Sequence, residues 1–176
     1  TIPAALTVLP RIRNLYLHNN QLSGSIPAWR SHIVNLNLMD NALTGSIPAV
    51  TMSNVWSLRL GNNQLNGTIP YFGNAAAATL KTLGLEGNQL TGSIPPYLIS
   101  LLSANFSNNL LDGPVPDMAV SLTSCDVSSN SDLCETFGVS NLCTTGLETC
   151  VTDCVILNAW LPAKFSGTGT NCCAQG

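Results

Sequence analysis

The chain has 176 residues, of which 45% are hydrophobic, so it is long and apolar enough to fold as one domain with a core. Charged residues make up 9%, and six basic against nine acidic residues leave a net charge of −3. Binding of nucleic acid needs clustered Lys and Arg, so this composition excludes that class. No apolar run reaches the ~18 residues of a membrane helix, and no signal peptide opens the chain. A mature or trimmed secreted segment is expected.

One pattern recurs along most of the chain: two Leu positions that alternate with polar ones, then Asn, Leu, Gly and Ile-Pro. Alternation predicts a short half-buried strand, and the Asn and Gly predict turns. The clearest copy contains Leu83, Leu85, Asn88, Leu90, Gly92, Ile94 and Pro95. The Asn markers are Asn20, Asn41, Asn63, Asn88, Asn109 and Asn130, which gives periods of 21 to 25 residues by subtraction. Such a period predicts a leucine-rich solenoid.

These residues resemble the plant-type extracellular leucine-rich repeat, whose consensus is LxxLxLxxNxLxGxIP. The resemblance implies a right-handed coil with a parallel sheet on its concave side and a second short strand through the Gly-x-Ile-Pro segment. Several copies are shorter than the common repeat of about 24 residues. We therefore expect 3₁₀ turns or loops on the convex side, with one helical turn at residues 75–78. About six repeats, the first truncated, should occupy residues 1–133, and a Cys-rich, partly helical cap or junction residues 134–176.

The repeated residues have expected structural roles. Inward Leu and Ile side chains should stack on the same positions of the next coil, where burial stabilises each by about 1.5–3 kcal/mol. The Asn side chains should turn inward and bond backbone groups that the bend leaves open, at about 1 kcal/mol per hydrogen bond. These Asn residues are therefore assigned no role in binding.

The cysteines are confined to the C-terminal part of the chain, which indicates disulfides and an oxidising, extracellular compartment. Zinc binding by Cys150 and Cys154 with Cys172 and Cys173 is the alternative, but the only histidines, His18 and His32, lie far upstream. We predict no metal and no cofactor. The disulfide candidates are Cys125, Cys134, Cys143, Cys150, Cys154, Cys172 and Cys173.

The segment NSDLCETF after Asn130 resembles the C-terminal cap of such arrays, with Cys134 in the cap position. Cys125 occupies an inward Leu position, so it is either a core thiol or a staple to the cap. Four cysteines (Cys125, Cys134, Cys143 and Cys150) allow three connectivities if they pair among themselves.

Residues 152–176 resemble the N-terminal cap that precedes such arrays, which ends in a Cys-Cys pair. This resemblance implies a disulfide between Cys154 and Cys172, and it leaves Cys173 in need of a partner beyond residue 176. At the other end, Ile2-Pro3 fits only as the tail of a repeat. The chain therefore reads as a window from a tandem array, or as a protomer that assembles head to tail into a filament. A degenerate C-terminal cap is the third possibility.

Two Asn-x-Ser/Thr triplets, Asn66-Gly67-Thr68 and Asn105-Phe106-Ser107, are candidate glycosylation sites of a secreted protein. A glycan on Asn105 would cover half of the concave face. In a repeat rich in Asn and Ser such triplets also arise by chance.

Outward strand positions form columns on the concave face, the usual recognition surface of solenoids. Because Tyr and Arg are typical of binding hot spots, the best patch combines one residue of each with a His and a Met. A solvated sheet with no strong ligand is the alternative. The binding candidates are Tyr16, His18, Asn37, Met39, Arg59 and Glu86.

Catalysis has little support, because no motif places a carboxylate or a nucleophile beside His18. We predict no enzymatic activity. The sequence favours an extracellular structural or assembly protein, whose partners are neighbouring copies of itself. The alternative is a secreted or cell-surface recognition module, like a receptor ectodomain or polygalacturonase inhibitor, that binds a protein, peptide or glycan. Ice or polysaccharide binding by rows of Ser, Thr and Asn is a third possibility.

Overall fold

The computed structural model describes residues 1–9, 11–29, 33–49, 54–98, 100–117, 121–135 and 143. Most of the expected junction over residues 134–176 lies outside these residues, and so do Cys150, Cys154, Cys172 and Cys173. The pairing of Cys154 with Cys172 therefore stays a prediction, as does the division of the chain at residue 134.

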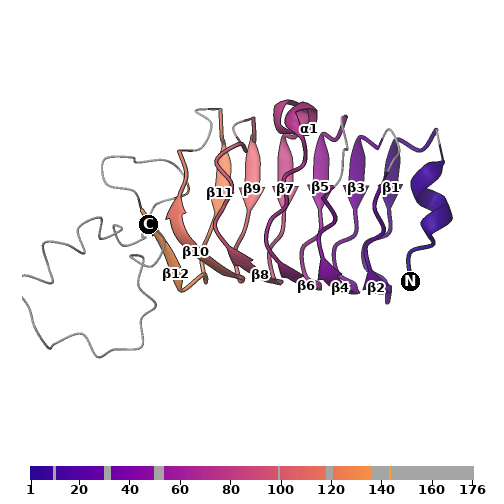
Figure 1. Ribbon diagram of the computed structural model, residues 1–176, viewed down its shortest axis with the longest axis horizontal. Helices are drawn as coiled ribbons and strands as arrows, with labels where there is room; N and C mark the ends of the chain where they lie inside the picture. Colours follow the sequence, from indigo (N-terminus) through magenta and orange to yellow (C-terminus); the bar gives the residue numbers. More distant parts are fainter. Residues whose placement is uncertain are drawn as a thin grey trace, which may run out of the picture.

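The described chain is a solenoid in which the coils build two parallel six-stranded sheets (Figure 1). The first sheet contains β1 (Asn14–Tyr16), β3 (Asn35–Asn37), β5 (Ser57–Arg59), β7 (Thr82–Gly84), β9 (Ser103–Asn105) and β11 (Ser124–Asp126). The second contains β2 (Ser23–Ser25), β4 (Ala42–Ser46), β6 (Gln64–Gly67), β8 (Gln89–Gly92), β10 (Leu110–Val115) and β12 (Asp132–Glu135). This confirms the expected leucine-rich repeat solenoid with two sheets.

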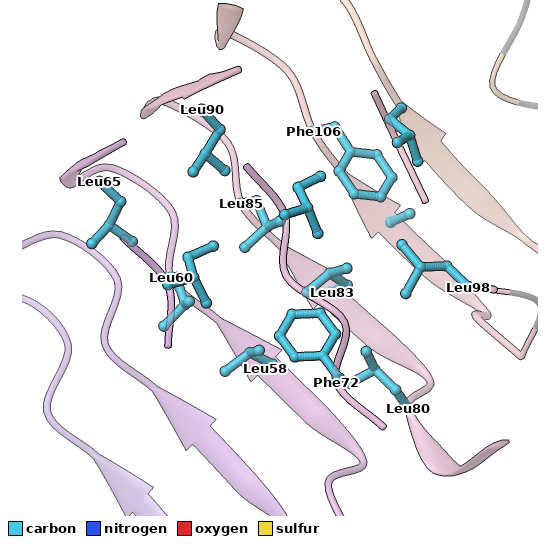
Figure 2. Packing of buried hydrophobic residues seen from close by; sticks show 14 of the residues in the cluster. Leu58, Leu60, Leu65, Phe72, Leu80, Leu83, Leu85, Leu90, Leu98 and Phe106 are labelled. Carbon is cyan, nitrogen blue, oxygen red and sulfur yellow. The ribbon is translucent and has the colours of Figure 1, made fainter. Parts of the chain in front are cut away.

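The first sheet is in register, so equivalent residues of successive coils lie side by side. Leu36 pairs with Leu58 and Leu58 with Leu83, and all three are 1% exposed. Their strand neighbours point outward because side chains alternate along a strand. The second Leu position of the repeat, two residues later, also faces inward. Figure 2 shows the resulting core, in which Leu58 and Leu83 lie close to residues at that second position, such as Leu85.

The Asn column turns inward, as expected. The Nδ2 group of Asn63 donates to the carbonyl oxygens of Leu38, Leu60 and Gly61 at 3.0–3.1 Å, and its Oδ1 accepts from the Leu43 N–H at 3.0 Å. Each buried Asn thus joins its own coil to the preceding one. Asn20 is exposed, and its side chain bonds only carbonyls of its own coil.

The second strand of each coil begins earlier than the sequence predicts. In β4 and β8 it includes the repeat Gly but ends before Ile-Pro. In β10 the strand instead runs through Pro114, which pairs with Cys134, and it ends at Val115. The Gly residues adopt positive φ, 77° at Gly45 and 74° at Gly92, which a residue with Cβ rarely adopts.

Helical structure in the described residues is short. A 3₁₀ helix covers Ala4–Val8, and α1 (Asn74–Thr79) includes the expected turn at residues 75–78. Figure 1 shows α1 beside β7, outside both sheets. Within the described part of the chain, no helix has the length and apolar character to cross a membrane.

A disulfide joins the last strand of the first sheet to a distant residue. Cys125, at the inward position of β11, is bonded to Cys143, which is 3% exposed. Of the two alternatives for Cys125, the staple is therefore correct. Cys134 is also disulfide-bonded. The bond to Cys125 ties Cys143 to the end of the core.

Candidate functional site

A hollow of about 360 Å³ lies on the outer face of the first sheet, across β1, β3, β5 and β7. Its lining combines two aromatic rings, one guanidinium group, and the hydroxyl and amide groups of the strands. The lining residues are Tyr16, Asn35, Leu36, Asn37, Trp56, Ser57, Arg59 and Thr82. We call this the Tyr16–Trp56–Arg59 hollow.

The backbone under the hollow is fixed by the sheet. Trp56 directly precedes β5, and its N–H donates to the carbonyl of Val34 at 2.8 Å. Its own carbonyl accepts from the N–H groups of Lys81 and Thr82 at 2.8 and 3.1 Å. The N–H and the carbonyl of Trp56 are therefore both hydrogen-bonded, while the residue as a whole remains 50% exposed. The sheet presents the ring to solvent from a rigid base.

The hollow brings together three of the residues predicted from the sequence, Tyr16, Asn37 and Arg59. Tyr16 is 58% exposed, and Arg59 is exposed as well. His18 lies beside the hollow, with its ring in edge contact with that of Tyr16 at 6.5 Å between centroids. Met39 does not line the hollow.

Trp56 is a site residue that the repeat pattern does not single out. Its column lies one position before the strands, outside the alternating residues, and the other coils place unrelated residues there. The sequence signal that could have identified Trp56 is that it is the only aromatic residue in this column. The equivalent residues are Arg13, Val34, Lys81, Leu102 and Thr123.

Farther along the same face, polar groups bond each other. The Oδ1 atom of Asn105 accepts from the N–H and hydroxyl of Ser107 at 3.1 and 2.8 Å. Asp126 accepts from the Ser128 N–H at 2.9 Å, and hydrogen bonds from Ser128, first from its hydroxyl and then from its backbone, lower the pKa of the Asp126 carboxyl. The same type of bond occurs in the hollow, where Asn37 Oδ1 accepts from the Met39 N–H at 3.1 Å.

The two sequons differ in exposure. Asn66 is exposed on β6 of the second sheet, whereas Asn105 is half-buried on β9 of the first. Glycosylation at both residues stays a prediction.

The hollow offers apolar area, hydrogen bonds and one positive charge, which suits it to binding. Its lining includes no carboxylate, His or Cys among the residues that the structure describes. Within those residues, no group of three or more His, Cys, Asp or Glu side chains could hold a metal ion.

Fold and hollow together define a leucine-rich repeat solenoid with an open concave-face site. The model of the Leucine Rich Repeat family matches residues 11–31 and 79–101. A crystal structure of a pollen receptor kinase 3 is similar, with a TM-score of 0.62 and 30% identity over 80% of this chain and 73% of that chain. The BIR2 ectodomain from Arabidopsis thaliana gives a TM-score of 0.57 and 32% identity over 73% and 72% of the two chains.

The Arabidopsis receptor kinase HAESA, solved with the peptide hormone IDA and the co-receptor SERK1, gives a TM-score of 0.64 and 27% identity. That match covers 78% of this chain and 24% of the HAESA chain. No curated protein sequence matches the chain. The chain belongs to the plant-type extracellular leucine-rich repeat family, as the repeat residues indicate.

Proposed function

We propose that this chain is an extracellular recognition module without catalytic activity, which binds a peptide or an extended protein segment in the Tyr16–Trp56–Arg59 hollow. The observation that carries this proposal is the pair of half-exposed aromatic rings beside an Arg on a rigid sheet. Trp, Tyr and Arg are the residues most often found at binding hot spots.

The shape and rigidity of the site favour an extended ligand. The hollow crosses four neighbouring strands, so a bound segment would lie along the solenoid axis and contact several coils. Because the backbone is already paired, binding orders only a few side chains, and little affinity is lost to ordering. HAESA, a similar structure, was solved with a peptide hormone, which supports a peptide as the ligand class.

The compartment follows from the same observations. A disulfide between Cys125 and Cys143 is expected in an oxidising environment. The similar structures include receptor ectodomains, which supports a secreted or cell-surface location. End-to-end assembly, which the sequence favours, stays a prediction because it rests largely on residues 152–176, which lie outside the described residues.

Selection of random linear peptides displayed on phage against the chain tests the proposal. We expect enriched peptides whose affinity falls about 30-fold in the double variant Tyr16→Ala/Trp56→Ala, since truncation of each hot-spot aromatic weakens binding by more than about 1 kcal/mol. Synthetic peptides measured by isothermal titration calorimetry give this ratio. The matched control is Tyr71→Ala, which removes an aromatic ring that is likewise 50% exposed but lies after β6. Enriched peptides that bind the double variant as tightly as the wild type, or no enrichment at all, would overturn the proposal.

A further inference from the structure

We propose that Glu86, beside the hollow, forms a subsite for a cationic side chain, Arg or Lys, of the bound peptide. This inference rests on the proposed function and adds to it the chemical class of one ligand residue.

The Glu86 carboxylate lies flat on the sheet because two glycines leave room for it. A Cβ atom at Gly61, on the preceding coil, would lie 2.5 Å from the Glu86 Cδ atom. A Cβ at Gly84 would lie 3.1 Å from Glu86 Oε2. A larger residue at position 61 would therefore displace this carboxylate. The Glu86 carboxylate thus occupies the space that a side chain at Gly61 would fill.

One oxygen of this carboxylate is without a partner. Oε2 is buried, and no donor in the described part of the chain hydrogen-bonds to it. Asp126, on the same face, shows the contrast, because its Oδ1 accepts from the Ser128 N–H at 2.9 Å. Because Oε2 receives no donor from the protein, the negative charge of Glu86 is not offset there, and a cationic group that approaches the carboxylate from the solvent is attracted to it more strongly than to Asp126.

The Glu86 carboxylate lies next to the hollow, on the side of Arg59. Gly84 pairs in register with Arg59, and a Cβ at Gly84 would lie 3.8 Å from Arg59 Cγ and 3.1 Å from Glu86 Oε2. The side chains of Arg59 and Glu86 thus both pass close to Gly84, which has no side chain of its own. A peptide in the hollow that passes over Gly84 would bring its next side chain to Glu86. Ammonium and guanidinium groups form the strongest hydrogen bonds to a carboxylate, so this side chain is Lys or Arg.

The test uses random linear peptides selected on three proteins: the wild type, Glu86→Gln and Asp126→Asn. We expect Arg or Lys to be enriched at one peptide position on the wild type and on Asp126→Asn, which serves as the matched control, but not on Glu86→Gln. Replacement of that Arg by citrulline, which is uncharged and nearly isosteric, should weaken binding to the wild type about tenfold. The same replacement should leave binding to Glu86→Gln unchanged.

Gly61→Ala provides a second variant that keeps the charge and displaces the carboxylate. Its preference for the Arg peptide over the citrulline peptide should also fall, and melting curves will show that each variant is folded. Equal binding of both peptides by the wild type, or the same Arg preference in Glu86→Gln, would overturn the inference alone, provided that binding still depends on Trp56. If no peptide binding depends on Tyr16 and Trp56, the proposed function fails as well.

Discussion

Replacement of Asn88 by Ala should lower the free energy of unfolding by about 3 kcal/mol, because it removes two amide N–H donors and one acceptor whose hydrogen bonds are worth about 1 kcal/mol each. Its Nδ2 group donates to the carbonyl oxygens of Leu60, Leu85 and Glu86 at 3.0–3.2 Å. Its Oδ1 accepts from the Leu65 N–H at 3.0 Å. Urea unfolding followed by circular dichroism measures the change.

The matched control is Asn20→Ala at the equivalent position of the first coil. Asn20 is exposed and bonds only the carbonyls of Leu17 and His18, which water can reach. Its loss should lower the stability by less than about 1 kcal/mol. Equal losses in the two variants would show that the bonds between coils contribute nothing beyond those within a coil.

Replacement of Phe106 by Ala should lower the free energy of unfolding by about 4 kcal/mol, through lost burial and the cavity left behind. Phe106 is 0% exposed and occupies the inward position held by Leu60 and Leu85 in earlier coils, as Figure 2 shows. Ala104, two residues earlier, is also buried, at 2% exposure. Its side chain is too small to fill the cavity that the missing Phe106 ring would leave.

Leu110→Ala is the control for this change. Leu110 belongs to the same coil but is 59% exposed at the start of β10, so its truncation should change the stability by no more than about 0.5 kcal/mol. Thermal and urea unfolding of both variants gives the comparison. A small loss in Phe106→Ala would mean that the core repacks around the missing ring.

The repeat pattern predicts the scaffold well because it is local and periodic. The alternation around Leu58 determines which side chains face inward, and the position of Asn63 after it predicts a bond to the bend of the coil. The start of the second strand is less well predicted, because positive φ at Gly45 lets the strand pass through the Gly rather than begin there. The spacing of the cysteines along the sequence does not determine that Cys125 pairs with Cys143, because this contact forms only in the folded chain.

The candidate site is only partly predicted from the sequence. Tyr16 and Arg59 follow from the strand columns, but Trp56 lies outside them and joins the hollow through the packing of neighbouring coils. The position of the Glu86 carboxylate depends on Gly61, which is 25 residues earlier by subtraction and becomes its neighbour only in the coiled chain. The sequence of a single repeat therefore does not predict the contacts between coils.

The central claim is that ligands bind in the Tyr16–Trp56–Arg59 hollow. Intermolecular nuclear Overhauser effects between a selected peptide and the 18.5 kDa chain test it most directly, because they report which rings the ligand touches. We predict contacts from the peptide to the Trp56 indole and the Tyr16 ring, and none to the equally exposed Tyr71. Contacts to Tyr71 or to the second sheet, with none to Trp56, would contradict the claim.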